Sequence, residues 1–320
     1  MSTPRQLKVS LVACAAAAAS LLHHAHAPAQ DARPAAPPRA LTVTVTDQKG
    51  SMVTGLGRES FTVLDGGRPS EIVSFASGDM PATVGVLLDA SGSMSSRESG
   101  LVRVRNALLR FFRNCHAADE FFLIAFNREP QLLLGMSNDP AAVLGALDRY
   151  GAARGGGPTA LYDALYLALN QAARGRHQKR ALLLVTDGQD NASRYTSEEV
   201  KRMLKESDVT VYAVHVFDPG DASALNYDGR LTLEGLAKLS GGRALFPSTV
   251  QELNSSLEAV ADELRNQYVI GFAPAPAGKK DGWHEVRVRL DEVRDGGGRK
   301  LKTVLRTRAG FYDVPPARPR

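Results

Sequence analysis

The pattern of hydrophobic and polar positions changes its period twice along the 320 residues of the chain. Both ends, outside residues 80–266, carry short stretches that are typical of strands. These stretches are 41–45 (LTVTV), 61–64, 71–75, 268–272, 284–290 and 301–306. The pair Gly66-Gly67 predicts a hairpin turn that leads into the strand at 71–75. Three strands are too few for an independent core, so we expect the two sets to pair into one small β-sandwich.

Between these ends, buried strands alternate with amphipathic helices. Continuous apolar runs such as Thr83–Asp89 (TVGVLLD) and Ala181–Thr186 (ALLLVT) are typical of strands that are covered on both faces. The predicted strands are 83–89, 121–126, 131–136, 181–186, 209–217 and 243–246, and the predicted helices are 101–115, 140–150, 160–173, 196–206, 231–239 and 250–266. This alternation predicts an α/β fold, with a doubly wound, mostly parallel sheet inserted into the sandwich.

The first 29 residues have the features of an export signal. Arg5 and Lys8 supply the positive charges, and residues 9–22 form an apolar stretch of about 14 residues, which is short for a membrane span. We expect cleavage before Gln30, because Pro28 disfavours the earlier small-residue site. The mature chain then has no transmembrane segment and lies in the periplasm or outside the cell.

The chain has two cysteines, too few for a disulfide scaffold or a multi-cysteine zinc site. Cys14 lies in a lipoprotein-like box, but most of the apolar stretch follows it, so lipid anchoring is disfavoured. Cys14 leaves with the signal, and Cys115 is interpreted as a small buried hydrophobe.

Six segments follow from these patterns. They are a signal peptide (1–29), a Pro/Ala linker (30–40), an N-terminal part of the β-sandwich (41–79), the α/β domain (80–263), a C-terminal part of the β-sandwich (264–313) and a tail expected to be disordered (314–320). The share of 43% hydrophobic and 23% charged residues excludes wholly disordered, collagen-like and polytopic membrane proteins. The net charge of +5 falls to about +3 without the signal, which does not indicate nucleic-acid binding.

Three loops carry the polar residues that point to chemistry. Asp89, Ser91 and Ser93 follow the first buried strand, Thr159 follows Gly155–Gly157, and Asp187 follows the strand ALLLVT. In a doubly wound sheet of order 3-2-1-4-5-6, the first and fourth strands are neighbours, and ligands bind beyond their carboxyl ends. Both aspartates should therefore converge at this point of the sheet.

Two carboxylates and three hydroxyls suit a hard divalent cation. Mg²⁺ prefers six oxygen ligands and uses one or two carboxylates, with Mn²⁺ or Ca²⁺ as alternatives. Neutral hydroxyl ligands leave the cation electrophilic, and a further ligand position remains for water or for an acidic side chain of a partner. This arrangement indicates binding more than catalysis.

The same residues carry a family resemblance. The chain resembles the von Willebrand factor type A (VWA) domain over about residues 80–263, because its metal-ion-dependent adhesion site uses D-x-S-x-S, a distant Thr and a distant Asp. Asp89, Ser91, Ser93, Thr159 and Asp187 match that pattern completely. The resemblance implies that the hydroxyls contact the metal and that the aspartates act directly or through water. The flanking strands are similar to secreted VWA-related bacterial proteins that are abundant in Acidobacteria.

Other polar residues have simpler interpretations. Gly155–Gly157 give the loop either plain flexibility or the freedom to bring Thr159 to the metal. For Asp190 we expect a role in a local turn and not a contact with the site. For Asp163 we expect a favourable charge in the first turn of a helix. The alternating Arg287, Arg289, Arg306 and Arg308 are more typical of solvated strand faces than of a groove for polyanions.

Catalytic alternatives find less support. A D-x-D phosphatase needs an aspartate where Ser91 stands, and the chain has neither G-x-S-x-G nor H-E-x-x-H. The histidines of the mature chain (His116, His177, His215 and His284) are scattered. We therefore expect an exported, non-enzymatic protein that captures the carboxylate of a protein partner through the cation. A metal-dependent hydrolase and a structural envelope module remain the alternatives, and the partner and the oligomeric state are left open.

Overall fold

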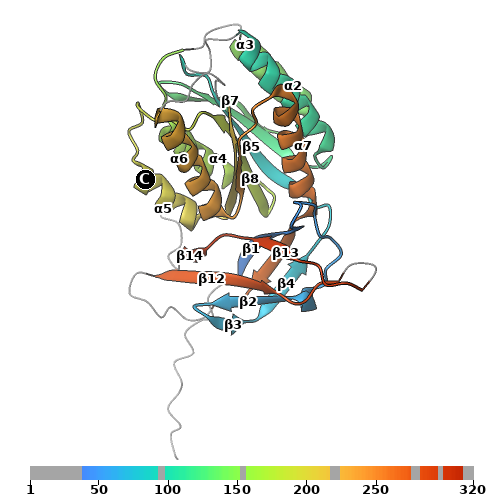
Figure 1. The fold of residues 1–320 in the computed structure, drawn as a ribbon. Helices are drawn as coiled ribbons and strands as arrows, with labels where there is room; N and C mark the ends of the chain where they lie inside the picture. The colour runs from blue at the N-terminus through green and yellow to red at the C-terminus, as the bar shows by residue number, and fades with distance from the viewer. Residues whose placement is uncertain are drawn as a thin grey trace, which may run out of the picture. The chain divides into compact units, whose positions relative to one another are not determined.

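The computed structural model describes residues 38–92, 98–151, 156–216, 224–274, 282–294 and 298–312. Its centre is a six-stranded sheet in the order β10-β9-β8-β5-β6-β7 (Figure 1). The strands are β5 (Ala82–Asp89), β6 (Glu120–Phe126), β7 (Pro130–Ser137), β8 (Lys179–Thr186), β9 (Val209–His215) and β10 (Arg243–Leu245). All neighbours are parallel except β7, which runs antiparallel to β6. The predicted α/β fold with its doubly wound sheet is confirmed.

Helices cover both faces of this sheet. They are α2 (Glu98–Asn114), α3 (Pro140–Gly151), α4 (Leu161–Ala172), α5 (Ser197–Glu206), α6 (Ala224–Ser240) and α7 (Val250–Asn266). One hydrophobic core joins the sheet to α2, α3 and α7, and the other joins it to α4, α5 and α6. This two-sided burial explains the continuous apolar runs of the strands.

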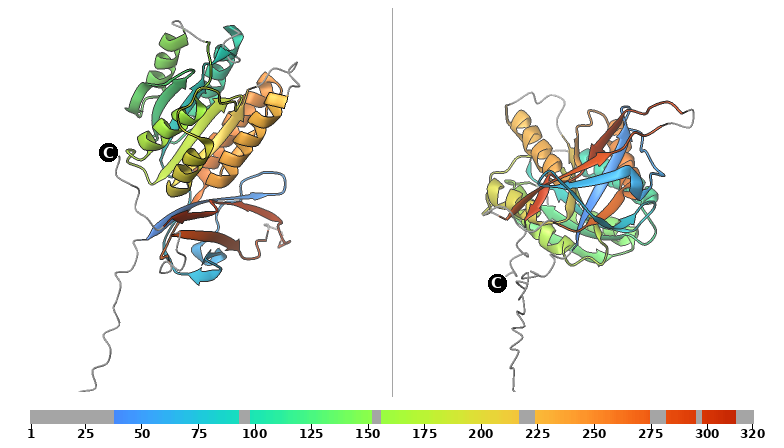
Figure 2. Two further views of the ribbon diagram at one scale, coloured as in Figure 1. Left: turned by 90° about the vertical axis from the view of Figure 1, so that its left-hand side faces the viewer. Right: turned by 90° about the horizontal axis from the view of Figure 1, so that it is seen from below.

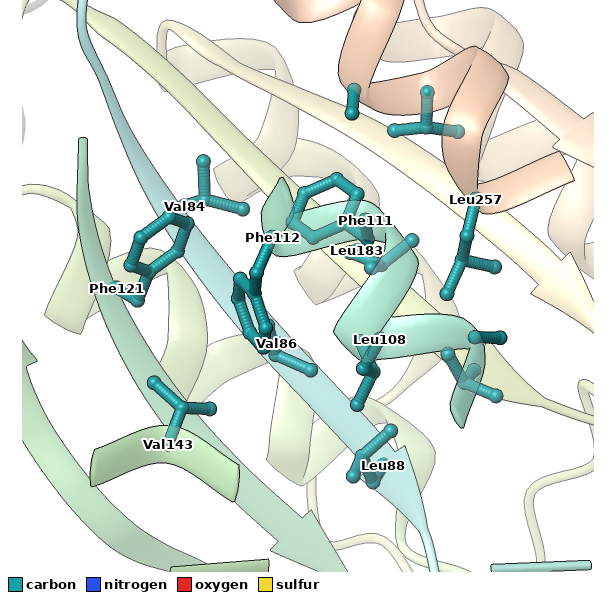
Figure 3. Close-up of a cluster of buried hydrophobic side chains, with 14 of the residues drawn as sticks. Val84, Val86, Leu88, Leu108, Phe111, Phe112, Phe121, Val143, Leu183 and Leu257 are labelled. Atoms are coloured by element: carbon teal, nitrogen blue, oxygen red, sulfur yellow. The ribbon is translucent and has the colours of Figure 1, made fainter. Parts of the chain in front are cut away.

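Strand β5 shows how the two cores are divided. Val84, Val86 and Leu88 face the core with α2 and α7, where Figure 3 shows them beside Phe111 and Leu257. Leu87 belongs to the opposite core, as the two-residue period of a strand requires. Gly85 also faces that side, and a Cβ there would lie 2.2 Å from the ring of Phe122.

Two four-stranded antiparallel sheets flank the α/β part, in the orders β13-β1-β11-β4 and β14-β12-β2-β3. Their elements are β1 (Arg39–Asp47), the 3-10 helix η1 (Arg58–Ser60), β2 (Phe61–Asp65), β3 (Arg68–Ser70), β4 (Ile72–Ala76), β11 (Tyr268–Phe272), β12 (Trp283–Leu290), β13 (Thr303–Arg306) and β14 (Gly310–Tyr312). Figure 2 shows blue N-terminal strands among red C-terminal ones. Each sheet thus combines strands from both ends of the chain around one core.

One sequence expectation about these strands is wrong. The turn Gly66-Gly67 joins β2 to the short strand β3, and β4 pairs with β11 in the other sheet. Strands β3 and β14 have three residues each, too few to show an alternating pattern. The six segment boundaries remain predictions, and the signal peptide and the tail lie outside the described residues.

A second correction concerns the arginines expected on solvated faces. Arg308 is 8% exposed, forms an ion pair with Asp208 and donates a 2.7 Å hydrogen bond to the carbonyl of Ser207. Arg306 pairs at 2.6 Å with Glu263 of α7. The period-two pattern placed both residues on a strand face, but it could not show that the start of β9 and the end of α7 would cover that face.

Glu263 is the centre of a buried polar network between α7 and the flanking strands. It is 2% exposed and accepts hydrogen bonds from Thr44 (3.0 Å) and from Tyr212 (2.8 Å). Gln267 donates to the same two hydroxyls, at 3.1 and 2.7 Å. Because a buried carboxylate needs compensating partners, this network joins α7, β1 and β9 at one place.

Lys179 at the start of β8 is buried nearby, and its ammonium donates to the carbonyl of Leu264. Burial lowers the pKa of Lys179 from 10.5 to about 8, although Asp119 and Asp79 oppose the shift. Between pH 8 and 10.5 the unfolded chain holds a proton that the folded chain has lost. The free energy of unfolding should therefore rise over this range, by up to about 3 kcal/mol.

The measurement is urea unfolding of the protein and of Lys179→Met across this pH range. The variant keeps the apolar stem and loses the titrating group. We expect the stability difference between the two proteins to shift in favour of the parent as the pH rises. A difference that stays constant with pH would contradict the assignment.

Candidate metal site

The two candidate aspartates lie at the carboxyl ends of neighbouring strands. Asp89 ends β5 and Asp187 directly follows β8, which is paired with β5 in parallel. One carboxylate oxygen of Asp89 accepts a 2.6 Å hydrogen bond from the hydroxyl of Thr186, and the other accepts a 2.9 Å bond from the backbone N–H of Ser91. Sequence reasoning missed Thr186, whose only signal is a threonine at the end of an apolar strand.

The electrostatics of these residues favour a cation. Asp89 is 2% exposed and Asp187 is 7% exposed. The pKa of Asp89 is raised from 3.8 to about 6, mainly by burial and to a smaller extent by the charge of Asp187, while hydrogen bonds from Ser91 and Thr186 lower it. Two buried carboxylates within electrostatic reach destabilise each other unless a positive charge lies between them.

The remaining donors are hydroxyls. Ser91 and Thr159 are buried as well, at 0% and 4% exposure, and Ser93 lies outside the described residues. Within the described ranges, no group of three or more His, Cys, Asp or Glu side chains could hold a metal ion. A metal here therefore depends on the hydroxyls, and an all-oxygen set of this kind fits a hard cation. The ligand set itself stays a prediction.

Backbone hydrogen bonds connect the first loop to the second. The N–H of Gly92 donates to the carbonyl of Gly157, and the N–H of Gly156 donates to the carbonyl of Ala90, both at 2.9 Å. Gly156 and Gly157 have φ angles of 118° and 97°, which L-residues rarely adopt. These two glycines therefore adopt backbone conformations that suit glycine, while Gly155 lies outside the described residues.

A second set of hydrogen bonds connects Thr159 to the third loop. The side-chain oxygen of Asn191 accepts a 2.7 Å bond from the N–H of Thr159. The N–H groups of Asn191 and Ala192 donate to the carbonyl of Thr159 at 2.9 and 3.0 Å. Asn191 thus fixes the backbone of Thr159 from both sides. No sequence pattern indicated this role, because the side chain of an Asn in a loop usually hydrogen-bonds to the backbone of its own turn.

Two further aspartates hold the same region together. Asp163, expected to act as a charge at the start of a helix, is buried and accepts hydrogen bonds from the N–H groups of Arg194 (2.9 Å) and Tyr195 (3.0 Å). Asp190 accepts from Ser193 and from the N–H of Tyr162 (3.3 Å). Both carboxylates therefore connect the third loop to α4.

The loop after β8 also packs tightly against α6. Gly188 has a φ of 83°, and a Cβ on Gly229 of α6 would lie 2.2 Å from the carbonyl oxygen of Asp187. His215, at the end of β9, is buried in the same region. Burial lowers the pKa of His215, while Asp187 raises it. The position of Asp187 therefore depends on the close contact between its loop and α6.

Gly229→Ala tests this close approach. The added methyl group would force the loop of Asp187 away, so the free energy of unfolding should fall by about 1–3 kcal/mol. Gly235→Ala is the matched control on the same helix, because a Cβ there meets nothing within 4 Å. Since alanine favours helices, the control should stabilise the protein by up to about 1 kcal/mol. Equal effects of the two substitutions in urea unfolding would refute the contact.

One protein family matches a segment of the α/β part. Residues 84–189 match the family model described as the von Willebrand factor type A domain. No match was found among the curated proteins.

Three of the similar solved structures come from different bacteria. The first is an aerotolerance-related membrane protein from Bacteroides fragilis NCTC 9343 (17% identity, 57% of this chain and 98% of that chain covered, TM-score 0.46). The second is a von Willebrand factor type A protein from Catenulispora acidiphila (13%, 87% and 75%, 0.47). The third is the PilB minor pilin from Streptococcus sanguinis (13%, 59% and 62%, 0.48). On the family match and the observed strand order, the α/β part of this chain has the von Willebrand factor type A fold.

Proposed function

We propose that this chain is an exported, non-enzymatic binding protein that captures an acidic group of a protein partner through a Mg²⁺-type cation. The proposed ligands are Asp89, Ser91, Ser93, Thr159 and Asp187. The observation that carries the proposal is the burial of two carboxylates and two hydroxyls on three loops that are joined by backbone hydrogen bonds.

The donor chemistry supports a role in binding. Two carboxylates and three hydroxyls leave one position of an octahedral Mg²⁺ for an incoming oxygen, and Mn²⁺ or Ca²⁺ would accept the same donors. Because the hydroxyls are neutral, the bound cation would still attract a carboxylate. The polar side chains around the site, such as Asn191, Asp163 and Asp190, serve to hold the loops in place. A rigid oxygen cradle of this kind is suited to presenting a cation to a partner.

Export is supported by the features of residues 1–29, namely two positive charges followed by an apolar stretch and small-residue cleavage sites. In the part of the chain that the structure describes, no helix is both long and apolar enough to cross a membrane. We propose that the mature protein acts in the periplasm or outside the cell.

The first test measures metal binding with Mg²⁺ and Mn²⁺ alone, by titration calorimetry. Asp89→Asn keeps the shape of the side chain and removes one ligand charge. We expect this variant to lose metal binding while it stays as stable as the metal-free parent, because a buried like-charge repulsion is removed. Asp262→Asn on the exposed face of α7 is the control and should bind metal normally. Unchanged affinity in Asp89→Asn would refute the proposed site.

The second test separates binding from the two alternatives. A pulldown from envelope extract is run with Mg²⁺ and with EDTA, on the parent and on Asp89→Asn. We expect a protein that is captured only by the parent and only with Mg²⁺, while circular dichroism shows that EDTA leaves the fold intact. Unfolding on chelation would favour a structural module. Metal-dependent turnover in a hydrolase screen would favour an enzyme.

A further inference from the structure

A groove of about 1170 Å³ lies between the end of α6, strand β10 and the flanking strands β12 and β13. Its walls include Lys238 and Arg243 on the α/β side and Arg287, Arg289 and Leu305 on the other. None of the residues that line it belongs to the three loops of the candidate metal site. Whatever the groove binds is therefore independent of the proposed cation.

The lining of the groove carries more cationic than acidic side chains. Glu234 and Glu285 are the acidic residues of its wall. Six cationic side chains oppose them, namely Lys238, Arg243, Arg287, Arg289, Arg306 and Arg308. This imbalance favours an anionic ligand, because the field of several cations in a concave surface adds up.

Part of this charge is already used within the protein. Arg243 and Arg306 share the carboxylate of Glu263, and Arg308 pairs with Asp208. Arg287 also pairs with the exposed Glu285 at 2.7 Å, so a ligand carboxylate at Arg287 has to share or displace this surface ion pair. Two buried donors on the wall, Nη1 of Arg306 and Oγ1 of Thr307, have no hydrogen-bond partner among the described residues. Because these two atoms are buried, the donors that can reach a ligand are the exposed guanidinium groups of Arg287 and Arg289.

The geometry of the wall suits an extended chain. Arg287 and Arg289 alternate along the exposed face of β12, so they lie about 6.6–6.8 Å apart. An extended peptide repeats its side chains at the same interval. Strand β13 is an edge strand of its sheet, and β10 is an edge strand of the central sheet. Such strands offer backbone groups to an added extended segment.

Apolar side chains complete the surface. Leu64, the cross-strand neighbour of Arg287, is half-buried, and Ala244 and Phe246 line the opposite wall. An extended peptide with acidic and apolar residues in alternation can use both the guanidinium groups and this apolar surface. A polysaccharide or nucleic-acid polyanion would match the charges of the groove. It has neither a peptide backbone that can pair with an edge strand nor apolar side chains for these walls.

We propose that this groove binds an extended acidic peptide segment of a partner protein, with carboxylates at alternate positions that meet Arg287 and Arg289. The segment lies along the free edge of β13, and its binding does not need the metal site. The chain would thus have two separate places of contact with protein partners.

The test uses a fluorescein-labelled octapeptide with glutamate at every second position and threonine and valine between, measured by fluorescence anisotropy. EDTA is present throughout, so the cation plays no part. We expect saturable binding that weakens as salt rises from about 50 mM to about 300 mM. The variant Arg287→Glu/Arg289→Glu should bind at least about tenfold more weakly, because both charges facing the peptide are reversed.

Two controls decide the result. Arg103→Glu/Arg113→Glu on the exposed face of α2 makes the same change in net charge outside the groove and should keep the parent affinity. Asp89→Asn should keep it as well, so failure of the metal proposal would not affect this one. Three results would each overturn the proposal. The first is an equal loss of affinity in both double variants. The second is equally tight binding of a peptide whose glutamates lie in one block, and the third is binding of heparin with no binding of the peptide. Matching circular dichroism spectra establish that the variants are folded.

Discussion

The parallel pairing of β5 with β8 is the constraint on which the candidate site depends. These strands are separated by about ninety residues in sequence, yet their register places Leu88 opposite Val185. Asp89 then lies within hydrogen-bond distance of Thr186, and Asp187 follows at once. Because the strand order reverses between β5 and β8, the helices leave toward opposite faces and the space beyond the strand ends stays open to a ligand.

The loops at this point are organised to hold charges that repel each other. Buried carboxylates without a cation lower the stability of the fold, and the raised pKa of Asp89 expresses this cost. The backbone of Thr159 is fixed by Asn191, and two glycines with positive φ connect its loop to Ala90 and Gly92. These bonds do not depend on the cation, so they keep the donors close together and reduce the reorganisation that binding would require.

The flanking strands are attached to the α/β part by a few buried polar contacts. Glu263 accepts hydrogen bonds from two elements and forms ion pairs with two arginines, and Arg308 reaches the start of β9. A carboxylate buried this deeply is tolerated only with such compensation, and removing one partner would reduce that compensation. The same contacts align strands β12 and β13 beside β10, and this alignment forms the cationic groove.

The α/β fold and the three loops of the candidate site could be predicted from the sequence alone, because burial on both faces and helical periodicity are local patterns. The sequence also placed Asp89 and Asp187 at strand ends. It could not reveal Thr186 and Asn191, which act through hydrogen bonds to residues far away in the chain. It also misjudged Arg306, since a strand's period shows which residues share a face but not what covers that face. The packing of distant elements decided those roles, and it alone formed the groove.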